Sequence, residues 1–176
     1  MRRPKDIEQE ARRLLENNQI VRTPIPVELL AKRLDIDVRY SPGKEDVSGA
    51  LIRNDDSVVI AVNSAQHENR QRFTIAHEIG HFLLHEGTRV HFDEDFRVNY
   101  RNAASSEATD TDEIEANRFA AALLMPADFL RRDLLRLKAD DQNIEKVIQS
   151  LSVRYKVSSR AMELRLVNLG FISPIG

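Results

Sequence analysis

Residues 70–85 read RQRFTIAHEIGHFLLH, and two of their histidines stand four positions apart. On an α-helix, side chains at that separation share one face with Cβ atoms about 5–6 Å apart, so His77 and His81 can bind one ion together. Glu78 is rotated by about 100° from His77, which places its carboxylate beside the ion rather than on it. The stretch therefore predicts a helical metal site with a carboxylate positioned to act on a water molecule.

A catalytic zinc ion needs a third protein ligand and an open position. His85 is rejected as that ligand, because the eight residues that separate it from His77 span about 12 Å along a helix. A carboxylate from a second helix is the better candidate, and Glu113 and Glu115 both stand there. Glu115 shares a face with Phe119 that can pack on the motif helix, so we favour Glu115. Glu113 stays the alternative, although its place in the first turn is explained by the helix dipole.

Gly80 lies inside the motif helix, where a glycine costs about 1 kcal/mol relative to alanine. Two explanations stay open. Either a backbone or substrate approaches closely at this position, or the helix simply tolerates the glycine.

The composition is that of a folded globular protein, with 41% hydrophobic and 31% charged residues and a net charge of -2. That charge excludes general nucleic-acid or membrane-surface binding by the chain as a whole. Cysteine is absent, which excludes thiolate chemistry and a disulfide framework. No apolar run reaches about 20 residues, and the basic start is followed by a charged run instead of a signal sequence. We expect a cytoplasmic protein that does not enter a membrane.

The apolar periodicity and the positions of proline and glycine predict an α+β protein. Short β-rich runs, two of them joined as a hairpin, precede the motif helix, and an irregular acidic stretch follows it. The predicted strands lie at 38–40, 49–53 and 58–62, the irregular stretch at 87–111, and the predicted helices at 5–17, 27–34, 66–86, 112–125, 127–137, 143–154 and 160–169.

Two blocks of sequence together resemble the ImmA/IrrE family of zinc metallo-endopeptidases. They are residues 70–85 and the block EANRFAAALLMP at 115–126, in the family's order and spacing. The resemblance implies a gluzincin-like site in which His77, His81 and Glu115 bind one Zn²⁺ and Glu78 is the catalytic acid/base. A set of two histidines and one carboxylate also binds other metals, so Mn²⁺ is an alternative.

The same resemblance implies a fold and a substrate. The fold is a zincin-like metallopeptidase core over residues 1–126, with a small antiparallel sheet and an active-site helix. Residues 127–176 form a helical, helix-turn-helix-like extension packed on that core. The implied substrate is a helix-turn-helix transcriptional repressor, whose cleavage relieves repression, and some members of the family act in toxin–antitoxin-like pairs.

The expected chemistry is hydrolysis of a peptide bond. Glu78 would take a proton from the attacking water and return it to the leaving amine. The developing oxyanion needs a hydrogen-bond donor besides the metal, and His85, Tyr100 and Arg101 are the candidates.

A non-enzymatic alternative rests on the C-terminal residues 143–169, which read as two helices around a short turn. Four of their cations could contact phosphate groups of DNA: Arg154, Lys156, Arg160 and Arg165. In that case the protein would be a regulator that binds DNA or a repressor, with zinc serving the structure. Residues 127–176 hold nine Lys/Arg against six Asp/Glu, a surplus too small to predict DNA binding.

Overall fold

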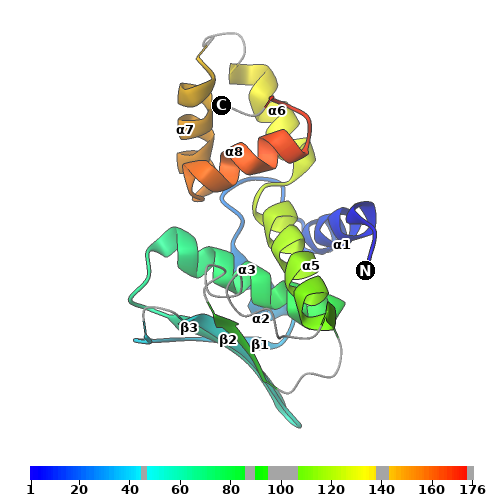
Figure 1. Ribbon diagram of the computed structural model, residues 1–176, viewed down its shortest axis with the longest axis vertical. Coiled ribbons are helices and arrows are strands. Elements are labelled where there is room, and N and C mark those ends of the chain that lie inside the picture. Colours follow the sequence, from blue (N-terminus) through cyan, green and yellow to red (C-terminus); the bar gives the residue numbers. More distant parts are fainter. Residues whose placement is uncertain (45–46, 86–89, 95–106, 138–142, 174–176) are drawn as a thin grey trace.

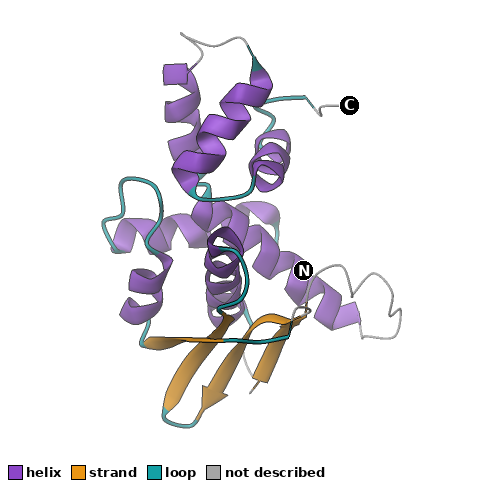
Figure 2. Ribbon diagram, turned by 90° about the vertical axis from the view of Figure 1, so that its left-hand side faces the viewer, coloured by secondary structure: helices purple, strands orange, loops and turns teal. Residues whose placement is uncertain are grey.

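The computed structural model describes residues 1–44, 47–85, 90–94, 107–137 and 143–173. A twisted sheet forms the base of the molecule, helix α3 (Glu68–Leu84) lies on it, and helix α5 (Glu107–Leu124) crosses α3 (Figure 1). The C-terminal helices stand on the far side of α3 from the sheet, as the turned view also shows (Figure 2). The motif helix is thus enclosed on several sides by the rest of the chain.

The two N-terminal helices match their predicted ranges closely. Helix α1 spans Pro4–Asn17 and buries one stripe at helical spacing, which consists of Ile7, Ala11, Leu14 and Leu15. Helix α2 spans Val27–Arg33 and contributes a further buried face. The prolines at 24 and 26 separate the two helices because proline cannot continue the hydrogen-bond ladder of α1.

The sheet contains four strands in the order β1-β3-β2-β4. They are β1 (Ile36–Ser41), β2 (Val47–Asn54), β3 (Ser57–Asn63) and β4 (Val90–Glu94). The predicted α+β class and the β2–β3 hairpin are confirmed, but the sheet is mixed, because β1 runs parallel to β3. The prediction of an irregular stretch at 87–111 is wrong at β4, which pairs antiparallel with the other edge of β2.

Close packing holds α3 between the sheet and α5. At Gly49 in β2, an added Cβ would lie 2.5 Å from the Thr74 side chain of α3, so only glycine fits without a shift. At Gly80 in α3, an added Cβ would lie 3.2 Å from the Cα of Ala116 in α5 and from the Phe119 ring. Of the two explanations for Gly80, the close backbone approach is therefore the one observed.

Three further helices complete the fold: α6 (Ala127–Leu137), α7 (Ile144–Tyr155) and α8 (Ser159–Asn168). The turn between α7 and α8 places Lys156 in the left-handed region at φ 52, and the Ser158 side chain caps α8. One hydrophobic cluster includes buried residues from α1 through to α8. The division of the chain at residue 126 stays a prediction. Among the described residues, no helix has the length and apolar character that crossing a bilayer requires.

Candidate metal centre

His77 and His81 lie on one face of α3, and both are almost completely buried, with 1% and 3% of their surfaces exposed. Their Nε2 atoms are 2.9 Å apart. The predicted pairing of the two imidazoles on one helix face is therefore present in the structure. Glu78, the residue that follows His77, is fully buried.

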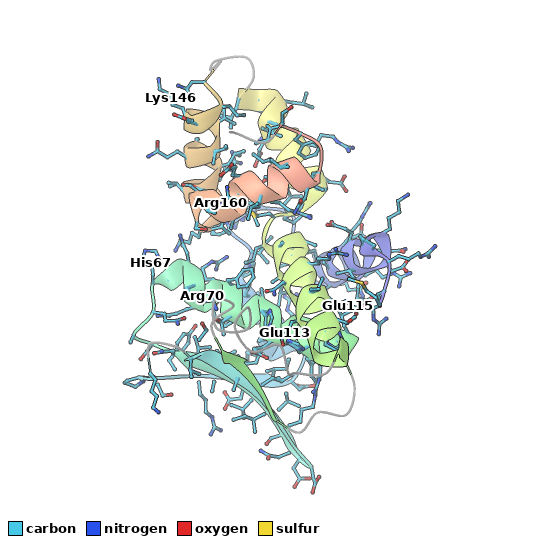
Figure 3. The ribbon with its side chains drawn as sticks, viewed as in Figure 1. His67, Arg70, Glu113, Glu115, Lys146 and Arg160 are labelled. Carbon is cyan, nitrogen blue, oxygen red and sulfur yellow. The ribbon has the colours of Figure 1, made fainter. Side chains whose placement is uncertain are left out.

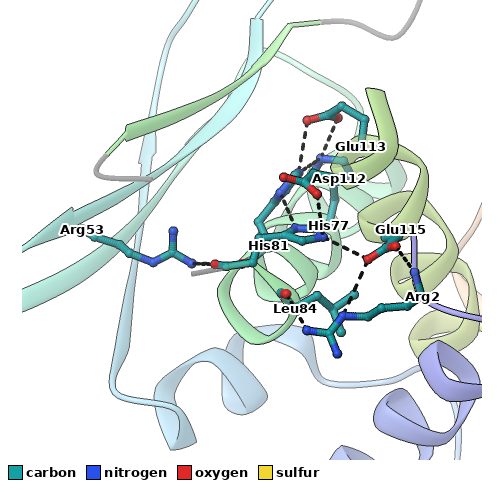
Figure 4. A network of polar contacts seen from close by, with 9 residues as sticks. Arg2, Arg53, His77, His81, Leu84, Asp112, Glu113 and Glu115 are labelled. Atoms are coloured by element: carbon teal, nitrogen blue, oxygen red, sulfur yellow. Dashed lines mark hydrogen bonds and ion pairs between the residues drawn. The ribbon is translucent and has the colours of Figure 1, made fainter. Parts of the chain in front are cut away.

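Glu113, near the start of α5, brings a carboxylate to the two imidazoles (Figure 4). Its oxygens lie 3.4 Å from Nε2 of His77 and 3.3 Å from Nε2 of His81. One atom from each residue can be chosen so that all lie within 4.8 Å of one another. Ligand atoms about 2.1 Å from a tetrahedral zinc ion would stand about 3.4 Å apart, so these donors fit such an ion after small adjustments.

The donor set also fits zinc chemically. Two imidazole nitrogens and one glutamate oxygen are one of the ligand sets of catalytic zinc sites, and they leave a fourth position open. Zinc and manganese both accept imidazole and carboxylate ligands, so the donor set fits either ion.

Glu115, the favoured third ligand, points to a different set of partners. Its carboxylate accepts a hydrogen bond from the backbone N–H of Arg2 and lies 3.7 Å from the Arg2 guanidinium Nε. Helix α5 approaches α3 closely at Ala116, and helix geometry sets the side chains of Glu113 and Glu115 about 200° apart around α5. Both glutamates lie at the same end of α5 (Figure 3). The structure thus replaces Glu115 with Glu113 as the candidate third ligand.

The environment of Glu115 favours its charged form. Burial raises the pKa of the Glu115 carboxyl, but the hydrogen bonds from the Arg2 backbone and from His85 outweigh burial, so the pKa lies below its ordinary value. The Arg2 guanidinium also donates to the carbonyl oxygen of Leu84 at the end of α3, at 2.8 Å. Arg2 therefore ties the first residues of the chain to both helices of the site.

His85 follows the last turn of α3 and touches protein groups through both ring nitrogens. Nδ1 lies 3.1 Å from Nδ1 of His81, and Nε2 lies 3.3 Å from a carboxylate oxygen of Glu115. These contacts agree with the rejection of His85 as a metal ligand, but they do not support it as an oxyanion donor. The other two candidates, Tyr100 and Arg101, lie outside the described residues.

Asn117 is a site residue that sequence reasoning missed. Its side-chain oxygen lies 3.1 Å from Nδ1 of His77. The oxygen can accept the Nδ1 proton, which leaves the Nε2 lone pair of His77 for an ion. Asn117 stands four residues after Glu113, so the same helix spacing that paired the histidines could have revealed it.

Arg53 of β2 holds the end of α3. Its guanidinium donates to the carbonyl oxygens of His81 and His85, each at 2.9 Å. Burial lowers the pKa of Arg53, and the negative charge of Glu78 acts in the opposite direction. The last carbonyl groups of the motif helix thus receive a cation from the sheet below, which favours the helix terminus electrostatically.

Comparisons with known proteins found a matching family profile and similar proteins. A profile described as the IrrE N-terminal-like domain, a peptidase family, matches residues 31–167. The chain is 36% identical over 110 residues to the radiation response metalloprotease IrrE of Deinococcus radiodurans, an alignment that covers 61% of this chain and 30% of that protein.

A solved structure named as a Mycobacterium tuberculosis transcriptional regulator has the same fold, with a TM-score of 0.62 and 20% sequence identity. The likeness covers 93% of this chain and 46% of that one. The chain therefore spans less than half the length of each of these two proteins.

Proposed function

This chain belongs to the peptidase family described as the IrrE N-terminal-like domain, and on that premise we propose that it is a zinc-dependent endopeptidase. The observation that carries the proposal is the convergence of His77, His81 and Glu113, beside the buried Glu78. The likeness to a protein named as a metalloprotease supports the same reaction class.

In the proposed site, the imidazoles of His77 and His81 and the carboxylate of Glu113 hold one zinc ion. When bound, the ion would act as a Lewis acid on the scissile carbonyl group and lower the pKa of a water molecule toward about 7. Asn117 keeps the proton of His77 on Nδ1, so that Nε2 faces the ion.

Glu78 is the proposed general base and acid. It follows His77 directly on α3, so its carboxylate lies beside the ligands rather than among them. It would accept a proton from the attacking water and pass it to the leaving amine, a role typically worth a factor of about 10²–10⁴ in rate.

The proposed substrate is a helix-turn-helix transcriptional repressor. This part of the proposal rests on the resemblance of residues 70–85 and 115–126 to the ImmA/IrrE family, whose members cleave such repressors. Cleavage would relieve repression of the genes that the repressor controls.

The second candidate function, a regulator that binds DNA through α7 and α8, has less support. Each of the four nominated cations lies in an ion pair within this chain. The pairs are Arg154 with Asp133, Lys156 with Glu68, Arg160 with Glu163 and Arg165 with Glu8. Arg165 is also 6% exposed, so phosphate could reach it only if α8 moved. Phosphate contacts at the other three would compete with their present carboxylate partners.

Members of the ImmA/IrrE family cleave repressors encoded beside them, so the test is cleavage of a helix-turn-helix repressor from a gene adjacent to that of this protein. The zinc-loaded wild type is expected to cut it, and Glu78→Gln is expected to retain one equivalent of zinc while losing cleavage. Glu68→Gln is a matched control on the same helix, because Glu68 is exposed and pairs with Lys156. Cleavage by Glu78→Gln at the wild-type rate would refute the mechanism. A shift of promoter DNA by the protein alone, without any cleavage, would favour the second candidate.

A further inference from the structure

A line of partly buried hydrogen bonds leads from His81 away from the candidate metal position. Nδ1 of His81 contacts Nδ1 of His85 at 3.1 Å, and Nε2 of His85 contacts the Glu115 carboxylate at 3.3 Å. Glu115 in turn accepts a hydrogen bond from the backbone N–H of Arg2. The side chains of His81 and Glu115 are each 4% exposed, and that of His85 is 11% exposed, so water competes little for these contacts.

Only one arrangement of protons satisfies this line when His81 binds an ion through Nε2. The Nε2 lone pair is then used, so the His81 proton sits on Nδ1 and must be donated to His85. Nδ1 of His85 must accept it, which leaves the His85 proton on Nε2. That proton points at the Glu115 carboxylate. An ionised carboxylate has no proton to donate and can only accept hydrogen bonds, so the pair is satisfied.

We propose that Glu115 and His85 form a positioning relay that fixes the tautomer and ring orientation of His81 for metal binding. The inference rests on the proposed metal site. Glu115 thus serves the metal from two residues away, through His85, and is not a ligand. Arg2 holds the far end of the relay, so the residues that precede α1 are coupled to the site.

A second carboxylate near the relay does not replace Glu115. The Asp112 oxygen lies 3.5 Å from Nε2 of His85, a longer contact, and its side chain is 47% exposed. Glu115 is the buried acceptor, and its own position is fixed by Arg2. Among the described residues, loss of Glu115 therefore leaves His85 with the half-exposed Asp112 carboxylate as its acceptor.

The direct readout is the zinc dissociation constant, measured by competition with a chromophoric chelator. Partners that orient a metal-binding histidine typically change metal affinity by about 10–100-fold. We expect losses in that range for Glu115→Ala and His85→Ala. Glu115→Gln keeps a side-chain oxygen that accepts the His85 proton, so its affinity is expected to stay within about threefold of the wild type. Glu113→Gln removes a proposed ligand and is expected to lose far more affinity than either.

Two further measurements separate positioning from general structural support. In the cobalt-loaded protein, Glu115→Ala and His85→Ala are expected to shift the visible absorption bands, whereas Glu115→Gln restores the wild-type spectrum. Arg2→Ala removes the Arg2 guanidinium but leaves Glu115 on His85, so thermal unfolding is expected to change more than zinc affinity.

Either of two results overturns the relay. One is a zinc affinity within threefold of the wild type for both alanine variants. The other is a loss in Glu115→Gln as large as that in Glu113→Gln, which would make Glu115 a ligand. A wild-type protein that binds no zinc would instead refute the proposed function, so the two failures are distinguishable.

Discussion

Gly80→Ala tests the close approach of the two helices that carry the metal site. Alanine has a higher helix propensity than glycine by about 1 kcal/mol, so a glycine that was merely tolerated would give a more stable protein on substitution. In the structure, the new methyl group would lie 3.2 Å from the Ala116 Cα and the Phe119 ring and 3.3 Å from the Ala116 carbonyl oxygen.

The magnitude follows from these contacts. Two of the three atoms belong to the backbone of α5, which cannot rotate away as a side chain can. Inserting a methyl group into such a contact costs about 1–3 kcal/mol. After the gain of about 1 kcal/mol in helix propensity, the expected net destabilisation is about 1 kcal/mol. For a chain of this size, that corresponds to a fall in Tm of about 2–4 °C.

The assay is thermal and urea unfolding of the wild type, Gly80→Ala and Gly80→Ser. The larger serine side chain is expected to destabilise more than alanine, because the steric conflict grows and serine has the lower helix propensity. A higher Tm for Gly80→Ala than for the wild type would show that α5 does not press on this position, and would refute the packing argument.

Three further substitutions test the packing around the site and the attachment of the C-terminal helices. Gly49→Ala would place a methyl group 2.6 Å from a carbonyl oxygen of β3. Urea unfolding should therefore show a fall of about 1–3 kcal/mol in the free energy of unfolding. An unchanged urea midpoint would contradict this prediction. Arg165→Met removes donors to the end of α5 and to the Glu8 carboxylate, the latter at 2.8 Å. Because Glu8 is partly exposed, the expected fall in the free energy of unfolding is about 1–3 kcal/mol. An unchanged free energy of unfolding would mean that α8 is held by apolar packing alone. Tyr155→Phe removes the hydroxyl that donates to the buried Asp133 at 2.8 Å. The free energy of unfolding is expected to fall by about 1–3 kcal/mol. The same substitution should cost less in an Asp133→Asn background.

Local sequence patterns were sufficient for most of the helices. Proline positions and apolar spacing are local signals, and they predicted α1 and α2 to within one residue at each end. Strand β4 was missed because it is five residues long and is defined by pairing with β2, about forty residues earlier in the chain. The parallel pairing of β1 with β3 is also a non-local arrangement, so no short stretch of sequence encodes it.

The same distinction explains the candidate site. The pairing of His77 and His81 follows from their spacing within one helix, which can be read directly from the sequence. The choice between Glu113 and Glu115 depends on which flank of α5 faces the imidazoles, and so on how α5 crosses α3 at Gly80. It also depends on Arg2, which engages Glu115 from 113 positions away in the chain. Helix periodicity contains neither piece of information.

The C-terminal cations show a related difference. Their placement around a helix-turn-helix-like turn left phosphate contact open as an alternative. Arg165 is instead buried and paired with Glu8 of α1, 157 positions earlier. A basic residue in a helix-turn-helix pattern is therefore available to DNA only if it is not buried in an ion pair with a carboxylate elsewhere in the fold.

The central claim is that His77, His81 and Glu113 hold one metal ion. A crystal structure of the zinc-loaded protein, with anomalous differences measured on both sides of the zinc edge, tests it most directly. The account predicts one peak about 2.0–2.2 Å from Nε2 of both histidines and from a carboxylate oxygen of Glu113. A peak bound by the carboxylate of Glu115, or no peak beside the two histidines, would contradict it.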